Sequence, residues 1–189
     1  GTLAQNAQQN ADVFREHFRL LYGRAPSFDP LVLDILTQRP VDHEMGLPPT
    51  EAEIKGAVAY LHDTSPGDTG IKARAWKVLS SDASAFILIR DFVLEFWESE
   101  AVPKSWETGL LAVLPKKGDL SLPGNYRGIM MLESSYKIIA VIIHQRLSPL
   151  CEELDHESQC GFRPARGCCD ATFTVKMAMK KRREHGLES

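Results

Sequence analysis

The sequence has no long apolar segment and no leader-like start. Its longest strongly apolar run covers residues 138–143, whereas a helix needs about 20 apolar residues to cross a bilayer. The first residues also lack the basic and apolar regions of a signal peptide. We therefore expect an intracellular protein of the cytoplasm or nucleus that makes no contact with a membrane.

A strong excess of either charge is also missing, because the 189 residues carry a net charge of −3. This value argues against a protein that binds polyanions over its whole surface. The charges are unevenly placed: residues 1–103 hold 9 Lys or Arg against 15 Asp or Glu, and residues 104–189 hold 13 against 10. Contacts with phosphate are therefore expected in the second part, and the 43% hydrophobic content is enough for a folded core.

Cysteine is scarce and confined to the last 40 residues, at Cys151, Cys160, Cys168 and Cys169. This spacing fits no zinc ribbon or knuckle, even with His156 close by. We expect free thiols in a reducing compartment, and zinc found in the purified protein would overturn that expectation.

Carboxylates arranged for a catalytic metal are missing as well. The acidic groups Glu51/Glu53, Glu98/Glu100 and Glu152/Glu153/Asp155 all lie in charge-rich segments with helical periodicity. Such groups are typical of solvated helix faces. No residue of the chain is therefore predicted to bind a metal or to act as a catalytic residue.

A hairpin with a basic tip is the most informative feature that the sequence contains. Short apolar runs at residues 110–114 and 129–132 flank a turn rich in Gly, Pro, Asp and Asn, which predicts two antiparallel strands. The hairpin would carry Lys116, Lys117 and Arg127 together. Arg can bind two phosphate oxygens at once and Lys acts as a mobile point charge, so this trio suits a triphosphate or a nucleic-acid backbone. An ordinary solvated turn is the alternative.

The remaining pattern is mostly helical. Thr50 and Glu53 form a capping-box pattern at the start of one helix. Gly67 and Gly70 surround Asp68 just before another predicted helix. Backbone N–H groups of this loop could bind a phosphate, or the loop could be a plain helix-entry turn. The helices are predicted over residues 7–22, 31–36, 51–61, 71–79, 82–100, 136–150 and 170–184. The helix over 136–150 is expected to pack beneath the hairpin.

The order of these motifs resembles the reverse transcriptase of non-LTR (LINE-type) retrotransposons, and more weakly that of group II introns. The resemblance covers residues 48–189, and its strongest pieces are Leu114-Pro115-Lys116-Lys117-Gly118-Asp119, Asn125-Tyr126-Arg127 and Gly161-Phe162-Arg163. It implies an α+β fold, namely the helix-rich fingers and proximal palm of a right-hand polymerase with a small antiparallel hairpin. Residues 1–47 would be a connector with an N-terminal helix.

Two departures from the family pattern and one absence stand out. Gly128 follows Asn-Tyr-Arg where the family usually has Pro, and the upstream loop has Asp68 one place earlier than the usual Pro-Gly-x-Asp-Gly-Ile. The chain also stops before the strands that carry the family's metal-binding aspartates. In the parent enzyme Mg²⁺ would therefore be held by residues outside this chain, with none bound by this fragment.

The resemblance also implies roles for individual residues. Lys116, Lys117 and Arg127 would bind the phosphates of the incoming nucleotide. Contacts with the RNA template and the DNA primer would come from Gly67, Gly70, Gln159, Gly161, Arg163, Arg166, Lys180 and Lys181. Phe162 is expected to be a packing anchor. The other partners would be the dNTP and the remainder of the palm and thumb.

Three alternatives remain open at this point. The chain is predicted to be a fragment of an RNA-directed DNA polymerase; otherwise it is a non-catalytic nucleic-acid-binding module derived from one. A protein-interaction domain, suggested by the acidic first part, would show no salt-dependent binding to an RNA/DNA duplex. The basic cluster Lys176, Lys180, Lys181, Arg182 and Arg183 is either a nucleic-acid contact or a solvated helix end stabilised by the helix dipole.

Overall fold

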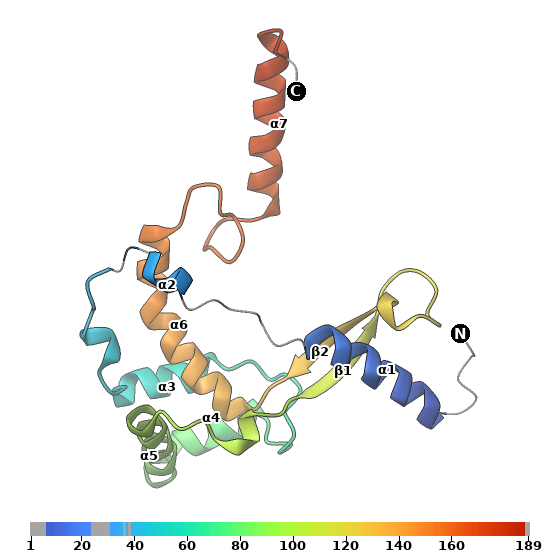
Figure 1. Cartoon of the computed structure of the whole chain (residues 1–189). Helices are drawn as coiled ribbons and strands as arrows, with labels where there is room; N and C mark the ends of the chain where they lie inside the picture. Colours follow the sequence, from blue (N-terminus) through green and yellow to red (C-terminus); the bar gives the residue numbers. More distant parts are fainter. Residues whose placement is uncertain (1–6, 24–30, 36, 38, 188–189) are drawn as a thin grey trace. The chain divides into compact units, whose positions relative to one another are not determined.

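The computed structural model describes residues 7–23, 31–35, 37 and 39–187. It divides into two compact units, residues 1–142 and 143–189, which are described in turn. The described part is rich in helix and contains a two-stranded sheet (Figure 1). This agrees with the helix-rich α+β composition and the small hairpin expected from the sequence, while the boundary after residue 47 stays a prediction.

The core of the first unit lies among α3 (Glu51–Tyr60), α4 (Ala73–Ser81), α5 (Ala83–Ser99) and the beginning of α6 (Ser134–Leu154). Apolar residues recur at helical spacing on each inward face, so each helix buries one side. The buried cluster contains Ile54, Ala57, Val58, Leu61, Ala73, Phe86, Ile89, Val93, Ile138, Ile139 and Ile142.

Side-chain caps fix where two of these helices begin. The Thr50 hydroxyl accepts the Glu53 N–H at 3.3 Å, and the Glu53 carboxylate accepts the Thr50 N–H at 2.8 Å. The Asp82 carboxylate accepts the N–H groups of Ser84 and Ala85. The predicted capping box is confirmed, and both caps satisfy donors that the helix itself leaves free.

An aromatic group centred on Trp106 closes one side of this core. Its ring lies 5.0 Å from that of Phe96 and 5.5 Å from that of Tyr136, measured between centroids. The indole N–H donates to the Ser135 hydroxyl at 2.9 Å. Trp106 therefore ties the segment before the first strand to the start of α6.

The predicted hairpin is present, with longer strands than expected. β1 (Leu110–Pro115) pairs antiparallel with β2 (Tyr126–Met131), and the register places Leu114 opposite Arg127 and Pro115 opposite Tyr126. The second strand begins three residues earlier than the apolar run predicted, because Tyr126 and Arg127 belong to the ladder.

The first helix, α1 (Ala7–Tyr22), has the bounds predicted from its apolar spacing. A short helix, α2 (Leu31–Ile35), occupies the apolar patch predicted to be helical, and Leu36 lies outside the described residues. Most of the expected connector between them, residues 24–30, also lies outside the described part.

Helix α6 differs from expectation in length and in packing. It runs from Ser134 to Leu154 and continues through Pro149. Its buried residues Ile138, Ile139 and Ile142 belong to the helical core, and that cluster contains no residue of the hairpin. The expected packing beneath the hairpin is therefore wrong: what buries this face of α6 is the group of helices α3 to α5.

The second unit contains the end of α6, a loop over residues 155–167 and α7 (Cys168–Glu184). α7 begins two residues before the predicted start, and none of its residues is buried. Within the described part of the chain, no helix combines the length and the apolar character needed to cross a bilayer.

Candidate nucleotide and nucleic-acid interface

The tip of the hairpin is held by its own hydrogen bonds. The Lys116 N–H donates to the Asn125 carbonyl at 2.7 Å, which extends the ladder by one pair. The Asn125 amide donates to the Asp119 carbonyl at 2.7 Å, and the Tyr126 hydroxyl donates to the Leu120 carbonyl at 3.1 Å. Residues 116–125 therefore form an ordered turn, although nearly all of its side chains are exposed.

This turn and the first residues of β2 bring the three predicted phosphate-binding cations onto one projection. The Lys116 ammonium donates to the Gly124 carbonyl at 3.5 Å. The exposed side chains of Lys117 and Arg127 have no hydrogen-bond or ion-pair partner among the described residues. Their charges are therefore available to an external anion.

One anion shares the tip with these cations. The backbone N–H of Ser121 donates to the Asp119 carboxylate at 2.9 Å and lowers the pKa of Asp119 below its usual range. The lowered pKa favours the charged form of the Asp119 carboxylate, so the tip carries one acidic side chain against the three basic ones.

Helix α1 covers the opposite face of the hairpin. The Phe14 ring meets the Tyr126 ring edge to face, with 4.7 Å between centroids. A Cβ added at Gly128 would lie 3.0 Å from Phe18 Cε1 and 3.0 Å from the Tyr22 hydroxyl oxygen. Gly128, which stands where the family pattern has Pro, therefore leaves the space that α1 occupies.

The loop over residues 65–70 is bonded to the start of α6. The Glu133 carboxylate accepts the Thr69 N–H at 2.8 Å and the Thr69 hydroxyl at 2.6 Å. The Gly70 N–H donates to the Gly67 carbonyl at 3.2 Å. α4 begins at Ala73, so the expected direct passage from this loop into a helix is wrong: two residues separate them.

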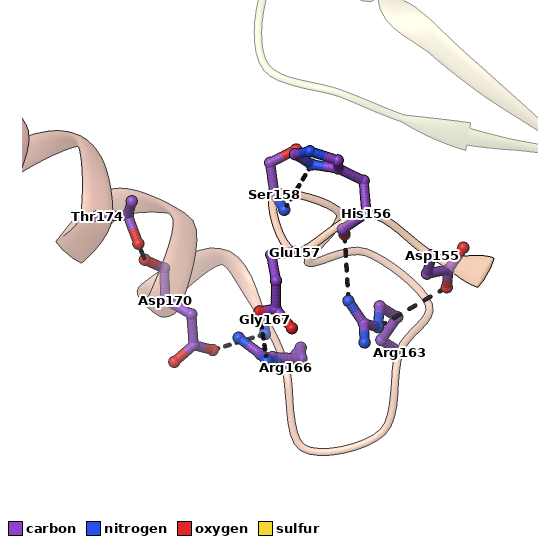
Figure 2. A network of polar contacts seen from close by, with 9 residues as sticks. All are labelled: Asp155, His156, Glu157, Ser158, Arg163, Arg166, Gly167, Asp170 and Thr174. Atoms are coloured by element: carbon purple, nitrogen blue, oxygen red, sulfur yellow. Dashed lines mark hydrogen bonds and ion pairs between the residues drawn. The ribbon is translucent and has the colours of Figure 1, made fainter. Parts of the chain in front are cut away.

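The loop over residues 155–167 is closed by its own arginines (Figure 2). Arg163 donates to the His156 carbonyl at 3.2 Å and lies 3.8 Å from the Asp155 carboxylate, with 13% of its side chain exposed. Arg166 donates to the Glu157 carboxylate at 2.9 Å. The structure thus gives both guanidinium groups a partner inside the loop.

The two other predicted contact residues of this loop bond to each other, since the Gln159 amide donates to the Gly161 carbonyl at 3.0 Å. Phe162 is fully exposed and has a φ of 61°. Its expected role as a packing anchor is wrong within the described residues, because the whole side chain is exposed. The next residue, Arg163, is the one largely covered, with 13% of its side chain exposed.

The same loop borders a cleft of about 820 Å³ in the second unit. Its lining comes from the end of α6 and the loop, and includes His144, Cys151, Asp155 and Phe162. All four cysteines of the chain are free thiols. The described residues contain no cluster of three His, Cys, Asp or Glu suited to a metal ion.

The basic cluster on α7 divides into paired and unpaired side chains. Lys180 and Lys181 lie 3.9 and 3.0 Å from the Glu184 carboxylate. Lys176, Lys180 and Arg183 share one face of the helix by their spacing and line a groove of about 400 Å³. Lys176 and Arg183 have no polar side-chain partner among the described residues, so this face presents two available cations.

Glu133 and Thr69 are the polar residues that sequence reasoning missed. Glu133 is 4% exposed, and its bonds to Thr69 join residues that are 64 positions apart. No local motif marks such a pair. The one usable signal was the family loop pattern, which has Asp where this chain has Thr69.

Two comparisons with known proteins bear on this arrangement. Residues 114–188 match the family model described as reverse transcriptase (RNA-dependent DNA polymerase). The chain is also similar to the transposon TX1 uncharacterized 149 kDa protein of Xenopus laevis, with 28% identity over 193 residues and 95% of the chain covered. Together they support a reverse transcriptase-related retrotransposon protein.

The two matches differ in extent. The chain spans 14% of the length of its Xenopus relative. The reverse transcriptase match includes the hairpin tip, the loop over 155–167 and α7, whereas Gly67 and Gly70 precede it. Among the predicted site residues, the structure places Lys116, Lys117 and Arg127 on one hairpin. Arg163 and Arg166 instead have partners inside their own loop.

Proposed function

We propose that this chain forms the fingers and the start of the palm of an RNA-directed DNA polymerase from a non-LTR (LINE-type) retrotransposon. The reaction would be RNA-templated addition of deoxynucleotides to a DNA 3′ end. RNA template, DNA primer and dNTP would be its partners, together with the remainder of the palm and the thumb. The reverse transcriptase match over residues 114–188 supports this proposal.

The hairpin tip is the observation that carries the proposal. Lys117 lies on the ordered turn and Arg127 on the strand that follows it, both without side-chain polar partners among the described residues, and Lys116 lies at the start of the turn. A guanidinium can bind two oxygens of a phosphate, and neighbouring ammonium groups neutralise further charge. The tip would therefore bind the triphosphate of the incoming nucleotide.

The described residues do not fit a catalytic metal site. Glu51 pairs with Lys55 and Arg90, and Glu53 caps α3, so this acidic pair serves the fold. None of the described residues is therefore proposed to hold a catalytic metal. In the parent enzyme, carboxylates elsewhere would hold Mg²⁺, which would activate the 3′ hydroxyl and stabilise the leaving pyrophosphate.

Duplex binding by the 189-residue chain tests the proposal. We expect binding to an RNA/DNA duplex that weakens steeply as salt rises, since each phosphate contact releases counterions. Lys117→Ala and Arg127→Ala should each weaken the binding of a fluorescent dNTP about tenfold, because each removes a charge-assisted contact with the triphosphate, and should leave the salt slope of duplex binding unchanged. Fluorescence anisotropy at several salt concentrations measures both quantities.

Lys77→Ala is the matched control, because Lys77 is an exposed cation of α4 whose side chain has no polar partner among the described residues. Duplex binding that does not depend on salt, or dNTP binding that Lys77→Ala weakens as much as Arg127→Ala, would contradict the proposal. A longer protein that includes this chain then separates enzyme from binding module. Primer extension supports the polymerase, and duplex binding without extension supports the non-catalytic module.

A further inference from the structure

Glu133 is a buried carboxylate without a cation beside it. It is 4% exposed and forms no ion pair with any described residue. Moving a charge out of water is costly unless other groups satisfy it. Thr69 does so with two donors, one for each carboxylate oxygen: its N–H meets Oε1 at 2.8 Å and its hydroxyl meets Oε2 at 2.6 Å.

Neighbours of Glu133 bond to the same loop on both sides of Thr69. The Ser134 hydroxyl donates to the Ile71 carbonyl at 3.0 Å. The Lys137 ammonium donates to the Thr64 hydroxyl at 3.2 Å. The beginning of α6 thus holds residues 64–71 at both ends and in the middle, and Glu133 supplies the middle contact.

Gly67 provides the space that this carboxylate needs. A Cβ at position 67 would lie 2.4 Å from Glu133 Oε1 and 2.8 Å from the backbone nitrogen of Glu133. Neither distance is compatible with a side chain at that position. Gly67, which was predicted to contact a phosphate, lies against this internal carboxylate.

We infer that Glu133 is the positioning residue of the loop over residues 64–71. An external phosphate has no access to the Thr69 N–H while Glu133 holds it. The inference rests on these contacts and does not require the proposed function.

Exchanging the two partners tests the inference. Thr69→Asp combined with Glu133→Asn keeps the summed side-chain length, with one carboxylate and one neutral partner. In the double variant the amide of the introduced asparagine can donate to the introduced carboxylate, but its carbonyl falls as short of the residue 69 N–H as in Glu133→Asn alone. Thr69→Asp alone would place two carboxylates together, and Glu133→Asn alone would fall short of Thr69.

Hydrogen exchange of the residue 69 amide, followed by NMR, is the readout. We expect exchange to be about tenfold faster or more in each single variant, because a charge-assisted bond is lost. In the double variant exchange should stay fast, because the shorter side chain at position 133 still does not reach this N–H. Glu98→Asn, a change at an exposed carboxylate of α5, is the control and should leave this amide unaffected.

Three results would overturn the inference. The first is unchanged exchange of the Thr69 amide in Glu133→Asn. The second is a double variant whose amide exchanges as slowly as in the parent chain. The third is a shift of the Thr69 amide resonance when inorganic phosphate is added to the parent chain.

Glu133→Gln keeps the side-chain shape and serves if the other single variants do not fold. It should speed exchange at residue 69 and leave the Ile54 amide in the core unchanged, and equal exchange rates at residue 69 would oppose the inference. None of these measurements involves duplex binding. A negative result here would therefore leave the proposed function untouched, and a failure of the proposed function would leave this inference untouched.

Discussion

Arg127 and Arg163 differ in what surrounds their guanidinium groups. Arg127 lies exposed on β2 with no polar side-chain partner among the described residues. Arg163 is mostly buried, donates to the His156 carbonyl and lies near the Asp155 carboxylate. An unpaired surface cation contributes little to stability, whereas a buried one that bonds to a backbone carbonyl holds a loop in place.

We therefore expect Arg163→Ala to loosen the loop over residues 155–167. Losing the bond to His156 should raise amide exchange within the loop about fivefold or more, since a charge-assisted bond contributes about 1.5 to 3 kcal/mol and partial exposure weakens it. Hydrogen exchange read by mass spectrometry measures this effect.

Arg127→Ala is the comparison and should leave exchange in the hairpin unchanged. Arg163→Lys should give an intermediate result, because an ammonium keeps the charge without the planar fork. Equal exchange in parent and Arg163→Ala would show that the guanidinium does not brace the loop.

The pairing of α1 with the hairpin is the contact between elements that most affects the candidate site. Phe14 packs on Tyr126, and Phe18 is 4% exposed. Tyr126 also bonds to the tip through its hydroxyl and precedes Arg127 in β2. α1 therefore supports the strand that carries Arg127, the proposed phosphate-binding residue, from the side opposite to Leu114 and Arg127.

Gly128→Ala should weaken this pairing. The added methyl group would lie 2.9 Å from Leu111 Cδ1 and 3.0 Å from Phe18 Cε1, so α1 must shift. We expect a loss of about 1 to 3 kcal/mol in the free energy of unfolding, measured by urea denaturation, with faster exchange in α1.

Gly124→Ala is a closely matched control in the same hairpin, because a Cβ at Gly124 meets nothing within 4 Å. That change should be neutral or slightly stabilising, since it restricts the unfolded chain. Similar destabilisation by both changes would mean that the space beside Gly128 has no special role.

Local sequence patterns predicted most of the helices and strands. The predictions that failed concern features that depend on contacts between residues distant in the sequence. Apolar spacing predicted α1 and α5, and the capping box predicted the start of α3. The strands of the hairpin followed from two apolar runs around turn formers. The packing of α6 and the bond between Glu133 and Thr69 depend on residues distant in the sequence, so no local period or motif reports them.

The candidate site was predictable to the same degree. The hairpin placed Lys116, Lys117 and Arg127 together, as the sequence indicated. The internal partners of Arg163 and the exposed left-handed Phe162 were not predictable, because they depend on the path of an irregular loop. Motif residues on the hairpin and its turn were thus located well, and motif residues on the irregular loop over residues 155–167 were not.

On the scale of the whole molecule, burial is concentrated in the first unit. The core cluster lies between Ile54 and Ile142, whereas α7 has no buried residue. An isolated helix of this length is marginally stable in water. The two units should therefore differ in local stability.

We expect amides of α7 to exchange with little protection, while those of α3 and α5 exchange only through global unfolding. Ala178→Gly should increase exchange in α7, because Gly costs about 1 kcal/mol in a helix, and should leave the urea midpoint of the core unchanged. Hydrogen exchange and urea denaturation on the same samples test both statements. Strong protection throughout α7 would indicate that it packs against another surface.

The bond between Glu133 and Thr69 also bears on how the chain folds. It closes a segment of 64 residues that contains α4, α5 and the whole hairpin. Contacts between residues so far apart form only after the chain between them has been ordered, since the entropy of closing the segment comes first. The helices can therefore form early from their own caps and periodicity, and the loop over residues 64–71 becomes rigid only when the beginning of α6 reaches it.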